Sequence, residues 1–276
     1  MRKIKRRLLG RARDLYDLED VIESPKYMRP QRVFDFMNRY QILLKKRAGW
    51  KEFVFEGADV LELGSGPMLG WGPLAIFLGS RRYTCIEPFY NHAIIESDAV
   101  RKNFFLPLFK DLSAIFGERY ESFDEFMRAV VEKSEIFRCE FEAAPCAGPY
   151  QISLSNSTLE HVSDLEGSLK KLKAISAPAG RFLHLVDFGN HRSTINPFDG
   201  IYSATPDEYF KRHGRHINLH RAPDMLRLFR QAGFFAEAVP YYHYREFYSG
   251  VINPYWSQRY SQDELFLKTA IICDAC

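Results

Sequence analysis

The stretch that most constrains the fold of this chain is Asp59-Val-Leu-Glu-Leu-Gly-Ser-Gly-Pro67. Its apolar residues favour a buried parallel strand, and Gly64 and Gly66 end that strand at once. Glycine allows a sharp turn and the close approach of a ligand, because it carries no Cβ atom. In open α/β sheets such a turn lies at the carboxyl end of a strand, where ligands bind. The stretch therefore predicts an α/β fold with a ligand site at this turn.

The composition is that of a soluble globular protein, since 46% of the 276 residues are hydrophobic and 26% are charged. Apolar runs stay shorter than the roughly 18 residues that a transmembrane helix needs. The N-terminus is charged, unlike a signal peptide. Five scattered cysteines indicate reduced thiols. We therefore expect a cytoplasmic protein.

Basic residues concentrate in residues 1–13, although the net charge of the whole chain is only +3. Two interpretations of this stretch stay open: a solvated terminus, or contact with an anionic membrane surface or a phosphate-bearing substrate. Because the basic charge is confined to this tail, we expect no nucleic-acid partner. An amphipathic pattern over 31–48 predicts a helix. Residues 1–50 are thus predicted to form an N-terminal helical extension, and residues 51–276 the main domain.

A second strand, predicted over 82–86, ends at Glu87, which lies 21 residues after Gly66. Such a strand–turn–helix–strand unit is expected of nucleotide-binding proteins, and its terminal acid can bind both ribose hydroxyls. Leu69 replaces the third glycine of the dinucleotide fingerprint, and the Gly-Lys-Ser/Thr of a P-loop is missing. Glu62, just before the glycines, suits a cationic group and would repel phosphates. These features predict a cationic nucleoside without a pyrophosphate.

Strands and helices alternate along the rest of the chain. Further strands are predicted over 136–141, 150–155, 181–187, 234–240 and 267–273. Helices are predicted over 69–78, 104–116, 123–134, 165–175 and 223–232. The pattern predicts a seven-stranded, mostly parallel sheet with helices on both faces and an antiparallel edge strand. Helical insertions are expected at about 91–134, 188–221 and 241–265.

Two segments give the sequence a likeness to a known family. Glu62–Gly66 is similar to an E-x-G-x-G motif, and Leu154-Ser-Asn-Ser-Thr-Leu-Glu-His-Val162 is similar to S-N-x-x-L-E-H-V. In this order and spacing they resemble the class I S-adenosylmethionine-dependent methyltransferases, in particular those of bacterial polysaccharide and secondary-metabolite pathways. Residues 173–182 resemble the family's next helix, turn and strand, with Ala179 in place of the usual first glycine.

The resemblance implies S-adenosyl-L-methionine as the cofactor, and it assigns a role to several positions. The glycine motif would hold the methionine end, Glu87 the ribose, Glu142 the adenine, and the segment after the fourth strand the other wall. The residues of the glycine motif are Glu62, Gly64, Ser65, Gly66 and Pro67. Those of the other wall are Asn156 and Leu159.

Methyl transfer to a hydroxyl requires an in-line geometry and a base, and an imidazole suits that role near pH 7. The candidates follow the fourth and fifth strands: His161, and His191 with Asp187 as the carboxylate that orients it. For both histidines a purely structural role stays open. The histidines lack metal-site spacing such as H-E-x-x-H, so we expect no metal.

Residues 241–260 carry eight aromatic side chains, which suit a sugar, a planar ligand or a protein interface, or pack over the sheet edge. We therefore expect an enzyme that methylates oxygen on a small-molecule, sugar-like acceptor, by analogy with the family. Two alternatives stay open: a catalytically silent scaffold with this fold, and an RNA or DNA methyltransferase that uses the basic N-terminus. The second is disfavoured, because Ser155–Thr158 stands where a base-flipping segment would lie.

Overall fold

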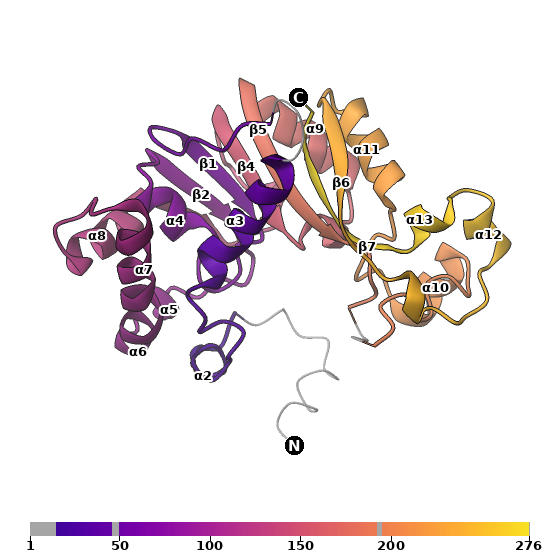
Figure 1. Cartoon of the computed structure of the whole chain (residues 1–276), viewed down its shortest axis with the longest axis horizontal. Coiled ribbons are helices and arrows are strands. Elements are labelled where there is room, and N and C mark those ends of the chain that lie inside the picture. The colour runs from indigo at the N-terminus through magenta and orange to yellow at the C-terminus, as the bar shows by residue number, and fades with distance from the viewer. Residues whose placement is uncertain (1–14, 46–49, 192–194, 276) are drawn as a thin grey trace.

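One seven-stranded sheet forms the centre of the protein, in a computed structural model that describes residues 15–45, 50–191 and 195–275 (Figure 1). The strand order is β3-β2-β1-β4-β5-β7-β6. β1 to β5 pair in parallel, and β7 pairs antiparallel with both β5 and β6. The predicted mostly parallel sheet with an antiparallel edge is confirmed. The strands are β1 (Asp59–Leu63), β2 (Arg82–Ile86), β3 (Ser134–Phe137), β4 (Tyr150–Asn156), β5 (Ser176–Asp187), β6 (Ala236–His243) and β7 (Leu267–Asp274).

The central strand β1 is buried along its whole length, between β2 and β4. Leu63, its last residue, lies beside Ile86 of β2 and Ser155 of β4. The strand order changes direction between β1 and β4, and ligands of open α/β sheets bind outside the strand ends at such a point. The topology therefore places the glycine turn where a ligand site is expected.

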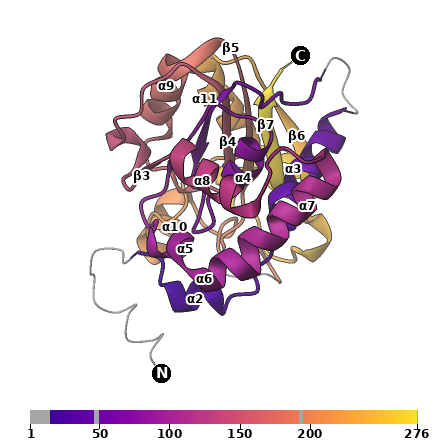
Figure 2. The same cartoon turned by 90° about the vertical axis from the view of Figure 1, so that its left-hand side faces the viewer.

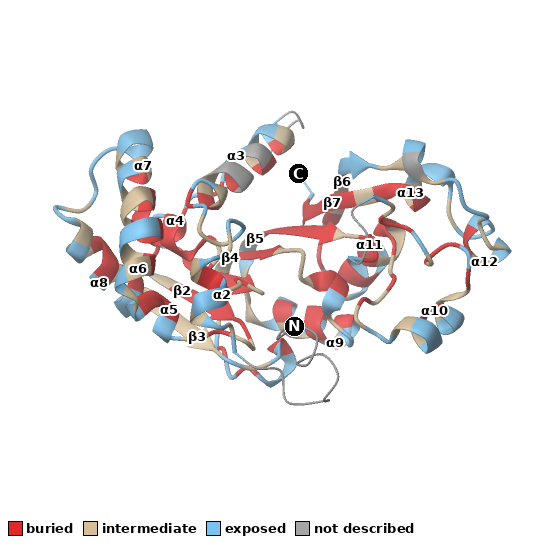
Figure 3. Cartoon of the chain, turned by 90° about the horizontal axis from the view of Figure 1, so that it is seen from below, coloured by how far each residue is buried: buried red, intermediate tan, exposed pale blue. Residues whose placement is uncertain are grey.

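Helices cover both faces of the sheet because neighbouring residues of a strand point to opposite sides. Val60 packs into one apolar core, with helices α3 (Arg32–Lys45), α4 (Gly72–Phe77), α7 (Leu106–Phe116) and α8 (Phe123–Lys133). Leu61 packs into the other, with α9 (Leu165–Ile175) and α11 (Ala222–Gln231). Figure 3 shows the buried strands between these helical layers, whose outward sides are exposed.

The first insertion is helical, as predicted, and consists of α5 (Ala93–Glu96), α6 (Asp98–Val100), the π-helical η1 (Arg101–Phe105), α7 and α8. α6, η1 and α7 follow one another directly and form the long helix seen in Figure 2. Pro107, near the start of α7, has no amide hydrogen for the carbonyl of Asn103 and crowds it. A wider π turn just before the proline relieves that crowding.

The second and third insertions pack on each other, at one end of the sheet (Figure 1). The second contains α10 (Pro206–His213), and the third contains η4 (Arg245–Phe247), α12 (Pro254–Ser257) and α13 (Gln262–Leu265). Together they form an aromatic core, defined by Phe198, Tyr202, Tyr209, Trp256 and Phe266. Most of the aromatic stretch predicted over 241–260 is thus used to build this core.

Two predicted positions are wrong. β3 covers Ser134–Phe137 instead of 136–141, because this edge strand is only half-buried and carries few apolar residues to mark its bounds. The turn expected within residues 173–182, ahead of the strand predicted over 181–187, lies instead within β5, where a bulge in the pairing with β4 leaves Pro178 exposed at the strand.

The segments outside the sheet add two findings. A short helix, α2 (Leu18–Ile22), precedes α3 and is capped by the side chain of Asp17, which accepts from the amide of Asp20. The basic residues 1–13 lie outside the described part of the chain. Among the described residues, no helix is both long enough and apolar enough to cross a bilayer.

Candidate active site

The turn after β1 depends on left-handed backbone at glycine positions. Gly64, Gly66 and Gly70 have φ values of +71°, +67° and +49°, a region that side-chain-bearing residues rarely adopt. A Cβ atom on Gly64 would overlap the side chain of Thr158, which follows β4. Glycine therefore lets the loops that follow β1 and β4 meet at the carboxyl edge of the sheet.

Glu62 braces this turn from behind. Its Oε2 accepts from the backbone amide of Trp71 and from the hydroxyl of Tyr83, both at 2.8 Å. A Cβ atom on Gly70 would overlap the same carboxylate. Burial raises the pKa of Glu62 to about 7, although the two hydrogen bonds oppose that shift. Glu62 thus fixes the turn by contacts to its backbone and its neighbours.

Glu87, at the end of β2, holds the front of the turn. Its Oε2 accepts from the amide of Gly66 at 2.8 Å, and its Oε1 accepts from the amide of Phe89 at 3.3 Å. Burial raises the pKa of this carboxyl. The backbone of Phe89 in turn accepts from the amide of Tyr16 at 2.8 Å, so the segment before α2 closes this end of the site.

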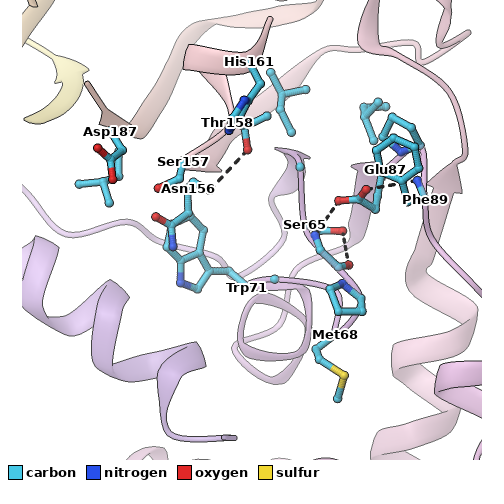
Figure 4. A pocket seen from close by; sticks show the side chains of 18 of the residues that line it. Ser65, Met68, Trp71, Glu87, Phe89, Asn156, Ser157, Thr158, His161 and Asp187 are labelled. Carbon is cyan, nitrogen blue, oxygen red and sulfur yellow. Dashed lines mark hydrogen bonds between the residues drawn. The ribbon is translucent and has the colours of Figure 1, made fainter. Parts of the chain in front are cut away.

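A cavity of about 990 Å³ runs from the glycine turn to the ends of β4 and β5. Figure 4 shows Ser65 and Glu87 at one end of it and Asp187 at the other, with Trp71 and Asn156 between them. Most of the predicted cofactor residues line it: Gly64, Ser65, Gly66, Pro67, Glu87, Glu142 and Asn156. Glu62 and Leu159 lie outside this lining, Glu62 behind the turn and Leu159 in the core beside α9.

His161 and Asp187 line the other end of the cavity. His161 Nδ1 lies 2.6 Å from the carbonyl oxygen of His216, so Nδ1 carries the hydrogen and Nε2 the lone pair. Asp187 accepts from the amide of Gly189 at 2.8 Å and pairs with Lys268 of β7 at 2.7 Å. Residues of three strand ends and one insertion therefore meet here.

His191 lies behind His161 and outside the cavity lining. The centres of the two imidazole rings are 4.8 Å apart. Its Nε2 lies 3.6 Å from Oε1 of Glu160 and 3.8 Å from Oδ2 of Asp187. The residue has a φ of 57°, which is strained for a side chain of this kind. Burial lowers the pKa of His191, and the nearby Asp187 carboxylate opposes that shift. The structure thus brings the three predicted catalytic residues together.

A second cavity, of about 400 Å³, adjoins the first and shares His161 and Arg215 with it. Its wall combines aromatic and polar side chains. They include Phe210, Tyr255, Trp256 and Tyr260, and Asn218, His220, Asp224 and Arg227.

The comparisons with known proteins decide the family. A family profile described as "Methyltransferase domain" matches residues 29–239, which is more than half of the chain. The chain belongs to this methyltransferase family. A search of curated protein sequences finds no match.

Solved structures of similar fold include two S-adenosylmethionine-dependent methyltransferases. The one from Aquifex aeolicus is 10% identical, with a TM-score of 0.44, and the match covers 94% of this chain and 98% of that one. The one from Mesorhizobium loti is 11% identical, with a TM-score of 0.46, and the match covers 86% of this chain and 97% of that one.

Membership of this family makes the protein an S-adenosylmethionine-dependent methyltransferase, and the predicted enzyme class and cofactor are confirmed. The cofactor supplies a sulfonium methyl group. The site of this methyltransferase fits the cofactor, because the cavity offers a turn without side chains at Gly64 and Gly66 and a carboxylate at Glu87. The residue-by-residue contacts to the cofactor remain predictions.

Sequence reasoning missed several residues of the methyltransferase site. Tyr16, Tyr27 and Tyr40 line the cavity from the N-terminal segment. The hydroxyl oxygen of Tyr40 lies 3.5 Å from Oδ1 of Asn156. No local motif marks these tyrosines. Glu160 lies within L-E-H-V, where a carboxylate next to a candidate histidine is the one signal in the sequence that marks it.

Proposed function

We propose that this methyltransferase transfers the methyl group to a hydroxyl of a sugar-like small molecule, with help from the histidines at the ends of β4 and β5. The observation that carries the proposal is the continuous cavity from the glycine turn, at the cofactor end, to His161 and Asp187 at the other end. A hydroxyl bound there lies beside imidazole and carboxylate groups.

The chemistry asks little of the protein beyond geometry and removal of one proton. The acceptor oxygen forms a bond to the methyl carbon, the carbon–sulfur bond breaks, and the hydroxyl proton leaves. The lone pair of His161 Nε2 is available at the cavity wall, because Nδ1 already donates to the carbonyl of His216. His191 and Asp187 support this imidazole from behind.

The second cavity supports a sugar as the acceptor. Rings with polar groups at their edges bind the apolar faces and hydroxyls of sugars. Here Tyr255 and Tyr260 combine with Asp224 and Arg227 in one wall. The cavity joins the first beside His161, so a sugar chain can extend from the reacting hydroxyl into it.

The test has two stages. Titration with S-adenosylmethionine measures cofactor binding. The protein is then incubated with S-adenosylmethionine and a panel of methyl glycosides, matched amino sugars and thiols. Mass spectrometry identifies the product and the methylated atom. Transfer to sugar oxygen supports the proposal. Transfer to nitrogen or sulfur alone overturns it, and cofactor binding without any turnover favours the catalytically silent alternative.

The location and the remaining partners belong to the same proposal. We expect the enzyme to act in the cytoplasm on a small molecule, without nucleic acid. Cell fractionation and a comparison of the full chain with a chain lacking residues 1–13 test both points. Strongly salt-dependent RNA or DNA binding that disappears with residues 1–13 would favour the nucleic-acid alternative.

A further inference from the structure

We propose that Glu160, His161 and His191 form a binding site for a divalent transition-metal cation beside the acceptor end of the cavity. One ligand atom from each of the three side chains lies within 4.8 Å of the other two. This inference deepens the proposed function, on which its catalytic part depends, and it replaces the expectation of no metal. Sequence spacing could not show the site, because its residues come from the loops after two different strands.

Glu160 is buried, with one carboxylate oxygen left without a partner in the described part of the chain. The residue is 2% exposed, and Oε2 has no hydrogen-bond partner among the described residues. Oε1 accepts a long bond of 3.3 Å from the amide of Asp187, and lies 3.6 Å from His191 Nε2. Buried carboxylate oxygens normally have partners, because an unpaired one is costly. A cation held by the histidines and by both carboxylate oxygens of Glu160 would supply the missing partner of Oε2.

The orientation of the two imidazoles also supports a cation site. Metal-binding histidines usually donate their other ring hydrogen to a carbonyl or carboxylate, which fixes the tautomer. His161 has this arrangement, with Nδ1 at 2.6 Å from the carbonyl oxygen of His216. His191 is held in left-handed backbone at a φ of 57°, so that its ring packs against that of His161. Such backbone strain clusters at functional sites.

The donor set indicates the kind of cation. Two imidazole nitrogens and one carboxylate oxygen suit Zn²⁺, Mn²⁺ or Fe²⁺, whereas Mg²⁺ and Ca²⁺ prefer oxygen ligands. Tetrahedral bonds of about 2.0–2.1 Å place ligand atoms about 3.4 Å apart. The His191–Glu160 pair, at 3.6 Å, already has nearly that spacing, and the remaining pairs need to close by about 1.4 Å at most.

The charges around the cluster are compatible with a cation. Asp187 Oδ2 lies 3.8 Å from His191 Nε2, and Lys268 pairs with the same oxygen at 2.7 Å. Lys268 therefore offsets Asp187, and a cation would take the place of a proton on the buried Glu160 carboxyl. Since His161 and Asp187 also line the cavity, a cation held here would favour ionisation of a hydroxyl bound at that wall.

Metal titration of the chelator-treated full-length protein tests the site without any acceptor. The probes are Zn²⁺, followed by calorimetry, and Co²⁺, followed by its visible absorption. We expect one equivalent to bind, and at least tenfold weaker binding in Glu160→Gln and in His191→Asn. His243→Asn is the matched control, because that histidine is exposed on β6 and belongs neither to the cluster nor to the lining of either cavity. The affinity of the control should be unchanged.

His191→Asn keeps the test decisive if Glu160→Gln fails to fold, because the His191 side chain is 28% exposed and its replacement should be tolerated. Absence of saturable binding, or equal affinity in His191→Asn and the unaltered protein, overturns the inference.

Methyl transfer is measured separately, with and without the bound cation. Metal binding without transfer to any hydroxyl overturns the proposed function and leaves the site standing. Transfer that needs no metal, in a protein that binds none, overturns only this inference.

Discussion

The backbone amide of Gly66 donates to Oε2 of Glu87 at 2.8 Å, which ties the glycine turn after β1 to the end of β2. The other oxygen of the same carboxylate accepts from the amide of Phe89. One side chain therefore positions two stretches of backbone at the cofactor end of the cavity, in addition to any contact with the ribose.

Glu87→Gln should weaken the binding of S-adenosylmethionine by about tenfold or more, because hydrogen bonds to a charged group are worth about 1.5–3 kcal/mol. Calorimetric titration measures the dissociation constant. Glu118→Gln is the control, since Glu118 is exposed beyond the end of α7. A dissociation constant within about twofold of the unaltered protein would show that Glu87 does not organise the cofactor end.

Three glycine-to-alanine variants separate backbone strain from crowding. Gly64, Gly66 and Gly117 all have positive φ, but only at Gly64 would a Cβ atom overlap a neighbour, the side chain of Thr158. Gly66→Ala and Gly117→Ala should each lower the free energy of unfolding by about 1–3 kcal/mol, the usual cost of a sparsely populated backbone conformation. Gly64→Ala should lower it further, in urea denaturation without cofactor. Equal losses at all three positions would contradict the close approach of the two loops.

Glu62 should make stability depend on pH. Burial raises its pKa to about 7 in the folded protein, from an ordinary value of 4.5. The folded state thus binds this proton more tightly, so the stabilisation is fully present below pH 4.5 and is lost as the pH rises through about 7. Relative to Glu62→Gln, the unaltered protein should lose about 3 kcal/mol across that range.

Urea denaturation of both proteins at several pH values measures this difference. Subtraction of the two curves removes the contributions of other shifted carboxyls, such as Glu87 and Glu160. A difference that stays constant with pH would mean that Glu62 titrates normally in the folded protein.

His161→Asn should lower kcat by about 10²–10⁴-fold, because the residue lies at the acceptor end of the cavity. The dissociation constant of S-adenosylmethionine should stay the same. This outcome is expected whether the imidazole takes the proton itself or holds a cation. His243→Asn again serves as the control for a general effect of losing a histidine. A variant with full kcat would remove His161 from the chemistry.

The sheet was predictable because its central strands are buried on both faces and are therefore mainly apolar, as in Val60–Leu63, where Glu62 is the one polar residue. The edge strand β3 lacks that signal, since all four of its residues are only half-buried. Pro178 marks a turn in most sequences, and here a bulge admits it into β5. These errors arise where tertiary context overrides a local signal.

The candidate site divides in the same way. Its cofactor end follows from a local motif, because Gly64, Gly66 and Glu87 belong to one strand–turn–strand unit. The acceptor end depends on distant contacts, such as that of His161 with the backbone of His216. Sequence spacing could nominate His161, His191 and Asp187, but it could not show that His191 lies behind His161 or that Glu160 is buried beside them.

The aromatic core of the second and third insertions has its own apolar interior, distinct from the two cores that flank the sheet. Buried Arg221 joins it to the end of β5, donating to the carbonyl of Phe188 and to the hydroxyl of Tyr202. The insertions that wall the second cavity can therefore diverge as one module while the cofactor half stays fixed. Exchange of both insertions together between related enzymes, with Arg221 retained, offers a route to new acceptor selectivity, whereas exchange of one alone would split a shared interior.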